Sequence, residues 1–500
     1  MIDVLYSLVD VNERFNRLIL DPLYIHNLDL TVKSSFIHNS STNNQILDRI
    51  CEKILPQIHD QVNELACEPH SIERILIIDY PELYSLSLIN FQKEIFSQYL
   101  TGNEILRYLL TNQITHLVVD IKNEIIAELF DENQLNIFPL ILCLCKRLTD
   151  LTFCEFSSNQ RLTISIFNLP SINCVSSTLM KLNIVVNTFD DCLYLLDGRL
   201  ECLSTLVIKI QRISRSVLNI DNTRKLLKFK YFSLTSVVHT IYYNEQIVPL
   251  LNRMINLEEL TLFITIFRHD SNYIDGTHLY DEILIYMPQL NKFTFSIITE
   301  IFINNINIDF PSNDNIQFSF IKKGFNQVGS YADFDSTKNL ARCHVYSLPY
   351  EFKLFINLNN FFQGGMFNKI RSLVMNDTSP FEHELFKLVS QDFPFLENLY
   401  VRNCHPQKNK QHSSTLILFS HLVALNLNQS TVDYAEQFLF EKNTRLPRLL
   451  KLTIRYETLA IITNNFTNDA ARLNCVNLQS IHTNKPFVRP EKFHQYFPLL

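Results

Sequence analysis

The chain has 500 residues, of which 46% are hydrophobic and 19% are charged, and its formal net charge is −7. This composition excludes a disordered chain, and the length exceeds the roughly 250–300 residues at which one hydrophobic core stops growing, so we expect several domains or a repeat array. The negative charge provides no general attraction for phosphate backbones, and nucleic acid is therefore not an expected partner.

Composition also indicates the compartment and the chemistry. The first twenty residues include Asp3, Asp10 and Arg17, and the sequence has no apolar run of about 20 residues, so we expect neither a signal peptide nor a membrane span. The eleven cysteines include no C-x-x-C pair, which is typical of reduced thiols. Phosphate-binding loops depend on glycine, and the chain has only seven glycines. We expect a cytoplasmic or nuclear protein without a metal site, a cofactor or a membrane partner.

The amino-terminal residues 1–30 have a helical apolar stripe, which Asp21 and Pro22 end. The stripe consists of Leu5, Leu8, Val9, Phe15 and Leu18. We predict a small helical segment over 1–30 and a second helical segment over 31–74 that leads into the rest of the chain.

A template of the form LxxLxL, with any apolar residue at its three fixed places, recurs thirteen times. Its middle residues are 24 to 34 residues apart in a first set and 26 to 29 apart in a second set. The copies are Leu83/Leu86/Leu88, Ile114/Leu117/Val119, Leu148/Leu151/Phe153, Leu179/Leu182/Ile184, Leu203/Leu206/Ile208, Phe229/Phe232/Leu234, Leu257/Leu260/Leu262, Leu290/Phe293/Phe295, Ile370/Leu373/Met375, Leu396/Leu399/Val401, Leu422/Leu425/Leu427, Leu449/Leu452/Ile454 and Leu478/Ile481/Thr483.

This period is typical of leucine-rich repeats. In each copy a short strand would direct the second and third fixed residues inward and the residues between them outward. Helices are expected between strands, with capping boxes at Thr188 with Asp191, at Ser430 with Asp433, and from Thr378, where Phe381, Leu385 and Leu388 share one face. The predicted fold class is α/β: a leucine-rich-repeat solenoid (horseshoe) with parallel strands on the concave face, helices on the convex face and a small helical amino-terminal cap. Repeats would occupy 75–296 and 367–500.

Residues 297–366 interrupt the period, and we predict an insertion there. Ile306, Ile308 and Phe310 alternate with polar residues, and Phe318 and Phe320 alternate again after a PSND turn. Two alternating runs around a turn predict a β-hairpin.

The amino-terminal segment resembles the second half of an F-box, a motif that is commonly followed by leucine-rich repeats. The matching residues are Asp3, Leu5, Val9, Asn12, Phe15, Asn16, Arg17, Leu18, Asp21 and Pro22. The resemblance implies a substrate-receptor subunit of an SCF-type cullin-RING ubiquitin ligase, which docks on a Skp-type adaptor and cullin complex and holds a protein substrate with its repeats. It also implies the adaptor-binding residues, namely Leu5, Val9, Phe15, Leu18 and Pro22.

The family's first half, a leucine-proline start and an isoleucine-phenylalanine helix, has no counterpart before Met1. We therefore expect either that the coding sequence begins further upstream or that this version no longer binds the adaptor. In the second case the chain would be a leucine-rich-repeat scaffold protein without a ubiquitin-ligase link.

The outward positions of the second repeat set provide candidate partner-binding residues. These are Asn398, Tyr400, Arg402, Lys451 and Arg455. Tyrosine and arginine are favoured in binding hot spots, and the alternative is an ordinary solvated sheet face.

Cys404 and His405 raise a third hypothesis, a thiol enzyme in which Asp392 or another carboxylate orients the base. Adjacent residues rarely face each other as nucleophile and base, so we expect a non-catalytic protein. In the repeat frame Cys404 falls three residues after Val401, where leucine-rich repeats accept asparagine or cysteine, and we predict that it serves the bend out of the strand.

Overall fold

The computed structural model describes residues 25–31, 47–122, 137–153, 165–166, 175–216, 224–269, 271–304, 311–325, 327–335, 338–409, 415–487, 489–490 and 492–500. The F-box-like segment at 1–22, with its five predicted adaptor-binding residues, lies outside these ranges. So does the first predicted hairpin strand at 306–310. The described part forms two compact units. Unit 1 contains residues up to 267 together with 278–293, and unit 2 contains 268–277 and 294–500.

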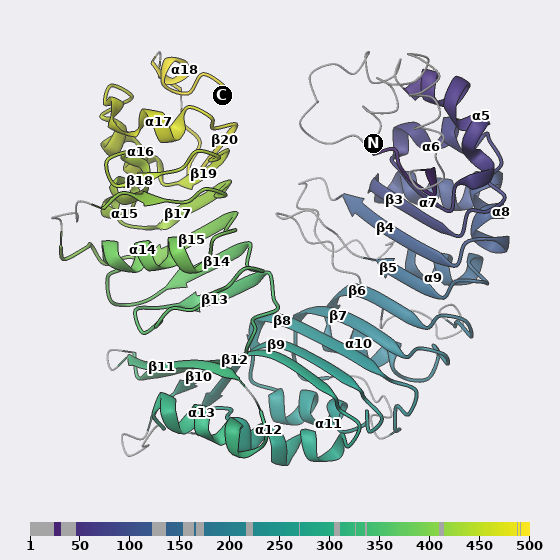
Figure 1. The fold of residues 1–500 in the computed structure, drawn as a ribbon, viewed down its shortest axis with the longest axis horizontal. Coiled ribbons are helices and arrows are strands. Elements are labelled where there is room, and N and C mark those ends of the chain that lie inside the picture. Colours follow the sequence, from purple (N-terminus) through teal and green to yellow (C-terminus); the bar gives the residue numbers. More distant parts are fainter. Residues whose placement is uncertain are drawn as a thin grey trace. The chain divides into compact units, whose positions relative to one another are not determined.

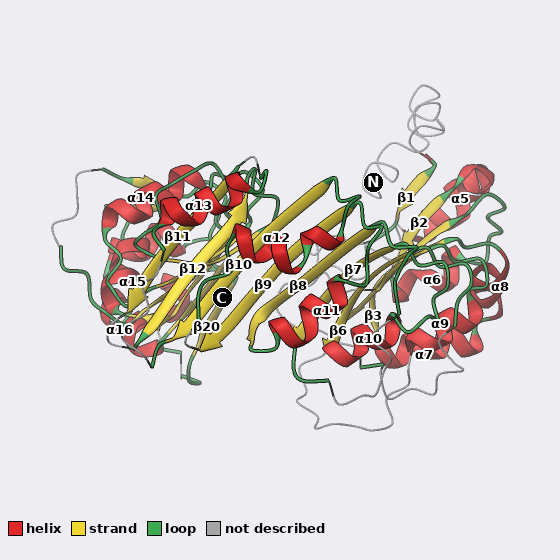
Figure 2. Cartoon of the chain, turned by 90° about the horizontal axis from the view of Figure 1, so that it is seen from below, coloured by secondary structure: helices red, strands yellow, loops and turns green. Residues whose placement is uncertain are grey.

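Unit 1 contains a parallel sheet whose strands follow one another in sequence order (Figure 1). Its strands are β1 (Asn27–Asp29), β2 (Glu64–Cys67), β3 (Ser85–Gln92), β4 (His116–Lys122), β5 (Asp150–Phe153), β6 (Lys181–Thr188), β7 (Thr205–Arg212), β8 (Tyr231–Thr240) and β9 (Glu259–His269). Figure 2 shows β7, β8 and β9 running side by side. Since β1 pairs with β2 and β2 with β3, the sheet begins earlier in the chain than the first predicted repeat.

Short helices connect these strands and pack on the buried face of the sheet, as Figure 1 shows. They are a π-helix at Ile50–Ile54, α5 (Leu55–Ile58), a 3-10 turn at His59–Gln61, α6 (Pro69–Ile75), α7 (Lys93–Gly102), α8 (Glu104–Asn112), α9 (Ile137–Leu144), α10 (Phe189–Leu195), a π-helix at Tyr243–Ile247, α11 (Val248–Leu251), α12 (Gly276–Glu282) and a 3-10 turn at Leu284–Tyr286. The capping box predicted at the start of α10 is confirmed, because Asp191 N donates a hydrogen bond to Thr188 Oγ1 and Thr188 N donates one to Asp191 Oδ2. Such crossover helices are what a parallel neighbour requires.

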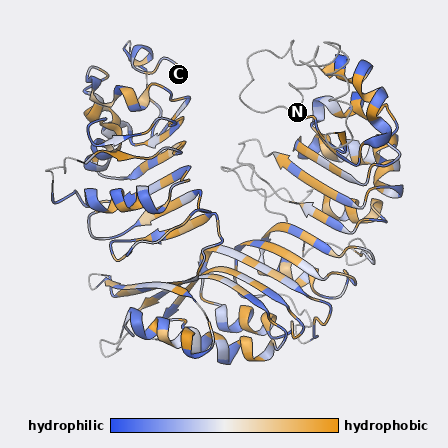
Figure 3. Ribbon diagram, in the orientation of Figure 1, coloured by the Kyte–Doolittle hydropathy of each residue, from blue (hydrophilic) through white to orange (hydrophobic). Residues whose placement is uncertain are grey.

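The register of the sheet in unit 1 follows the sequence template. Each middle template residue is the Cα partner of the next one, in a continuous row through Leu86, Leu117, Leu151, Leu182, Leu206, Phe232 and Leu260. All of these side chains are buried. Figure 3 shows the resulting alternation of hydrophobic and hydrophilic residues along the strands. The predicted parallel stacking of the template strands is therefore confirmed.

Unit 2 has a three-stranded antiparallel arrangement, a parallel sheet and a small two-stranded pair. The antiparallel strands, in spatial order, are β10 (Lys292–Phe302), β12 (Leu340–Ser347) and β11 (Val328–Asp335). The parallel sheet contains β13 (Leu354–Leu358), β14 (Ser372–Asn376), β15 (Asn398–Asn403), β17 (Ala424–Ser430), β19 (Lys451–Ile454) and β20 (Ser480–Thr483), and the small pair is β16 (Ile417–Leu418) with β18 (Thr444–Arg445). Its helical elements are α13 (Asn313–Lys322), α14 (His383–Asp392), α15 (Val432–Leu439), α16 (Tyr456–Thr463), a 3-10 turn at Asp469–Ala471, α17 (Arg472–Cys475) and α18 (Phe493–Tyr496).

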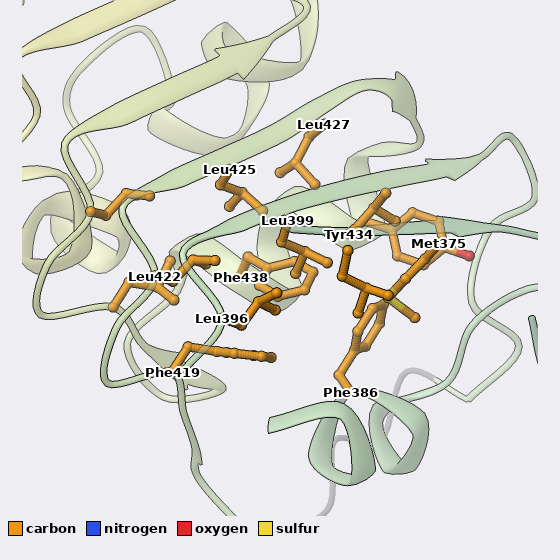
Figure 4. Close-up of a cluster of buried hydrophobic side chains, with 14 of the residues drawn as sticks. Met375, Phe386, Leu396, Leu399, Phe419, Leu422, Leu425, Leu427, Tyr434 and Phe438 are labelled. Carbon is orange, nitrogen blue, oxygen red and sulfur yellow. The ribbon is translucent and has the colours of Figure 1, made fainter. Parts of the chain in front are cut away.

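The parallel sheet of unit 2 keeps the same register as the template. Its central row of Cα partners runs through Leu373, Leu399, Leu425, Leu452 and Ile481. Figure 4 shows Leu399 packed among side chains from the segment just before β15, from β17 and from the helices α14 and α15. These side chains are Leu396, Leu425, Phe386 and Phe438. The predicted boundaries at 75, 297 and 367 remain predictions, although β13, which lies in the predicted insertion, pairs in parallel with β14.

The hairpin predicted within 297–366 is wrong in its second strand. Phe318 and Phe320 lie on α13, whose N-cap Ser312 accepts a hydrogen bond from Asn315 N. Ile316 and Phe320, four residues apart, are both buried, whereas Phe318 is 63% exposed. The burial thus follows the helical period rather than the alternation of a strand. The antiparallel strands β11 and β12 occur further along the same segment.

Two of the expected helix starts are also displaced. α14 begins at His383 with Glu382 as its N-cap, and it buries Phe386 and Val389 rather than the predicted face of Leu385 and Leu388, which are only half-buried. α15 has Thr431 as its N-cap, because the hydroxyl of Ser430 donates to Leu427 O and does not cap the helix.

Side chains link the antiparallel strands of unit 2 to β13. The hydroxyl of Tyr331 donates to Asn357 O over 2.9 Å, and Asn359 Nδ2 donates to Asp333 Oδ1 over 2.9 Å. His344 lies fully buried beneath them, with Nδ1 3.1 Å from Tyr331 Oη and Nε2 2.9 Å from Ser296 Oγ. Desolvation lowers the pKa of His344 to about 3, so the ring is neutral and its two nitrogens serve as one donor and one acceptor.

Candidate interaction surface

The outward face of the unit 2 sheet is defined by the residues that alternate with the buried template positions. Strand geometry places them on the side opposite Leu399 and its neighbours. They are Ser372, Val374 and Asn376 of β14, Asn398, Tyr400 and Arg402 of β15, Ala424, Asn426 and Asn428 of β17, Lys451 and Thr453 of β19 with Arg455 just after it, and Ser480 and His482 of β20.

All five predicted partner-binding residues lie on this outward face, but not all on neighbouring strands. Asn398, Tyr400 and Arg402 are on β15, whereas Lys451 and Arg455 belong to β19, and β17 lies between these strands. Two strand spacings correspond to about 10 Å. Whether these residues bind a partner remains a prediction.

Cα partners on β15, β17 and β19 form rows that run across the three strands. One row contains Asn398, Ala424 and Lys451, and the next contains Tyr400, Asn426 and Thr453. Alanine and asparagine are short, so the middle strand presents less side-chain bulk than the tyrosine and the long cations beside it. The outward face therefore has a strip of small and amide side chains bordered by larger ones.

Hydrogen bonds hold part of the outward face in place. Arg455 Nε donates to Asn428 O over 2.8 Å, which fixes the arginine against β17. Asn398 Nδ2 donates to Ser372 Oγ over 3.2 Å, across to β14. These bonds restrict side-chain rotamers before any partner arrives and so reduce the entropy lost on binding.

The bend after β15 is stabilised by Asn403 and not, as we predicted from the sequence, by Cys404. Cys404 is exposed, whereas its neighbour Asn403 is buried. Asn403 Nδ2 donates to Ser379 O over 2.7 Å, and its Oδ1 accepts from His405 N over 2.9 Å. The bend therefore rests on Asn403, because a buried amide satisfies backbone groups where the chain leaves the strand.

Asn403 belongs to a polar row that the template did not reveal. Ser430 is its Cα partner on β17, and buried Asp377 follows β14. Asp377 Oδ2 accepts from Asn360 N and Nδ2, both over 2.8 Å. The sequence did contain a signal, since a polar residue follows the third template place by two or three residues in these successive copies.

Among the described residues, no hydrogen bond or ion pair joins the His405 ring to Cys404 or to Asp392. Both backbone groups of His405 form hydrogen bonds. Its carbonyl accepts from Tyr434 Oη over 3.0 Å, and its amide donates to Asn403 Oδ1 over 2.9 Å. Asp392 Oδ2 instead accepts from Gly365 N over 2.9 Å.

Within the described ranges, no cluster of three or more histidine, cysteine, aspartate or glutamate side chains is arranged to hold a metal ion. No helix in this part of the chain combines the length and the apolar character needed to cross a membrane.

Comparisons with known proteins place the chain in no family. No family model matches the sequence. No curated protein matches it either. Among solved structures, an LRR (leucine-rich-repeat) protein of Leptospira interrogans is 13% identical to the chain, over 90% of this chain and 96% of that one, with a TM-score of 0.24.

Proposed function

We propose that this chain is a non-catalytic protein-interaction subunit built as a leucine-rich-repeat solenoid of the horseshoe type. The observation that carries the proposal is the coincidence of the sequence period with the register of both sheets, in which successive template leucines are Cα partners. A repeated apolar frame of this kind exposes an extended row of outward side chains, which is the surface that repeat proteins use for binding.

The partner of the outward face is a protein, and the outward residues of β15 are its central contacts. Tyr400 and Arg402 lie there beside the amides of Asn398 and Asn426. Tyrosine and arginine combine large contact area with directed hydrogen bonds and are enriched in binding hot spots. In this proposal the chain acts in the cytoplasm or the nucleus.

The binding surface can be tested with a paired substitution. Tyr400→Ala with Arg402→Ala should remove proteins that co-purify with the parent chain, as measured by quantitative mass spectrometry. Tyr108→Ala with Arg107→Ala, which changes the same residue types on helix α8, is the matched control and should leave the set of partners unchanged. An identical set of partners from all three proteins would refute the binding role of the outward face.

A ubiquitin-ligase role is the finer form of the proposal. It is supported only by the F-box-like order of residues in 1–22, and the alternative is a repeat scaffold without an adaptor. Co-expression of the full chain with a Skp-type adaptor and cullin should give a stable complex that Phe15→Asp and Leu18→Asp abolish. If the parent chain retains no adaptor, the scaffold function stands and the ligase link is removed.

A further inference from the structure

The outward face of the unit 2 sheet is positively charged. Its charged residues are Arg402, Lys451 and Arg455, and none of its fourteen positions is aspartate or glutamate. The chain as a whole has a net charge of −7, so this local excess of cations runs against the overall balance. A cationic surface on an acidic protein is a specific feature of that surface and does not follow from composition.

These three cations also lack the carboxylate partners that nearby cations have. At the borders of the same sheet, Arg371 Nε lies 3.5 Å from Glu397 Oε1, and Lys485 Nζ lies 3.3 Å from Glu457 Oε1. Within the described ranges, no ion pair involves Arg402, Lys451 or Arg455. Their charge is consequently available to a molecule that approaches the outward face.

The sheet of unit 1 shows that the same repeat geometry can neutralise outward charges. Asp150 of β5 and Lys181 of β6 are Cα partners on adjacent strands, and their side chains are 2.8 Å apart. On β17 and β20, by contrast, the positions next to Lys451 hold Ala424 and Ser480.

The spacing of the cations fits an extended polypeptide. Arg402 lies on one side of β17, and Lys451 and Arg455 lie on the other, about 10 Å away. Along an extended chain, side chains on one face repeat every ~7 Å, so two carboxylates two to four residues apart can reach both rows of cations. The amides of Asn426 and Asn398, between and beside these rows, match the donors and acceptors of a peptide backbone.

We propose, on the basis of the protein-interaction function above, that the outward face of unit 2 binds an acidic segment of its partner in an extended conformation. Arg402, Lys451 and Arg455 pair with its carboxylates, and Tyr400 packs against its side chains. Arg455 is already held by Asn428 O through Nε, which leaves the two terminal nitrogens of its guanidinium to meet a carboxylate.

Peptide selection on the full-length chain tests this proposal directly. Displayed random peptides of about 12 residues, which span some 40 Å when extended, are selected on the parent chain and then sequenced. We expect the selected peptides to be enriched in aspartate and glutamate. The enrichment should disappear with Arg402→Gln, Lys451→Gln and Arg455→Gln combined.

A second triple variant controls for net charge. Lys408→Gln, Lys442→Gln and Arg448→Gln remove three exposed cations elsewhere in unit 2 and should leave the enrichment unchanged. Equal loss in both triple variants would show nonspecific attraction and overturn the proposal. Selected peptides without acidic enrichment would also overturn the proposal of an acidic partner, but the protein-interaction function would stand. That function fails only if Tyr400→Ala with Arg402→Ala also leaves the set of co-purified proteins unchanged.

The best selected acidic peptide then provides a quantitative readout. Fluorescence anisotropy should show binding that weakens about 10-fold for each single arginine substitution, the loss expected for one charge-assisted contact. Binding should also weaken as NaCl rises from about 0.05 M to about 0.5 M, because screening shortens the reach of surface charges. If a labelled oligo-dT of similar length binds through the same three residues and the acidic peptide does not, the proposed partner chemistry is wrong.

Discussion

Replacement of Leu399 by alanine tests the repeat register at its centre. Leu399 is fully buried, and its Cα partners on the two neighbouring strands are Leu373 and Leu425. The substitution removes three carbon atoms, which corresponds to about 2.4 kcal/mol of transfer free energy at ~0.8 kcal/mol per carbon. The flanking strands are fixed by backbone pairing and cannot close the cavity, so the total loss should be about 4 kcal/mol, within the usual range of 2–5 kcal/mol.

The loss should spread to adjacent strands, because each repeat is stabilised mainly by its neighbours. Hydrogen exchange measured by mass spectrometry can locate the loss of stability, because amides of β14, β15 and β17 should exchange faster in Leu399→Ala. The midpoint of thermal unfolding should also be lower. Leu418→Ala is the matched control, since Leu418 lies on β16 and is 51% exposed. If Leu399→Ala exchanges and unfolds like the parent, the register described above is refuted.

Three further predictions concern polar and titratable groups in the described part of the chain. In the folded chain His344 is neutral, with a pKa of about 3, whereas in the unfolded chain it binds a proton near pH 6.5. The free energy of unfolding should therefore fall as the pH drops below about 6.5, by about 2 kcal/mol between pH 7 and pH 5 in urea unfolding. His344→Gln should abolish this part of the pH dependence. Asn403→Ala leaves Ser379 O without its partner in a buried bend and should lower the free energy of unfolding by about 1–3 kcal/mol, with no change in urea midpoint counting against the proposed role of this amide. Cys404 and Cys143 are both exposed and should react with a thiol probe at similar rates, whereas a rate for Cys404 about ten times that of Cys143 would revive the thiol-enzyme hypothesis.

The parallel sheets could be predicted from the sequence because their residues repeat the same burial. A position such as Leu425 must be apolar in every copy, since it packs between equivalent residues of the strands before and after it. Regular spacing then compensates for the weakness of each single match. The short run around Phe318 had no such repetition, and three apolar residues at alternate positions fit one turn of a helix as well as a strand.

The polar residues that support the bends were harder to recognise from the sequence. Asn403 and Cys404 are adjacent and both types are accepted at this place in leucine-rich repeats, so the sequence did not decide which of them is buried. Burial follows the alternation of β15, which continues two residues past Val401 and places Asn403 inward. The strand is longer than the template, and its extra residues determine which side chain meets the loop.

Charge pairs between neighbouring repeats can, by contrast, be predicted from the sequence once the repeat length is known. Lys230 and Glu258 pair across 28 residues, and Arg371 and Glu397 pair across 26, each about one repeat apart in the sequence. The same step from Arg402 arrives at asparagine on β14 and glutamine on β17, because its Cα partners there are Asn376 and Gln429. An outward cation with no carboxylate one repeat away in either direction can therefore be recognised from the amino-acid sequence and the repeat length. Arg402 and Lys451, on the surface for which we propose an acidic partner, both meet this criterion.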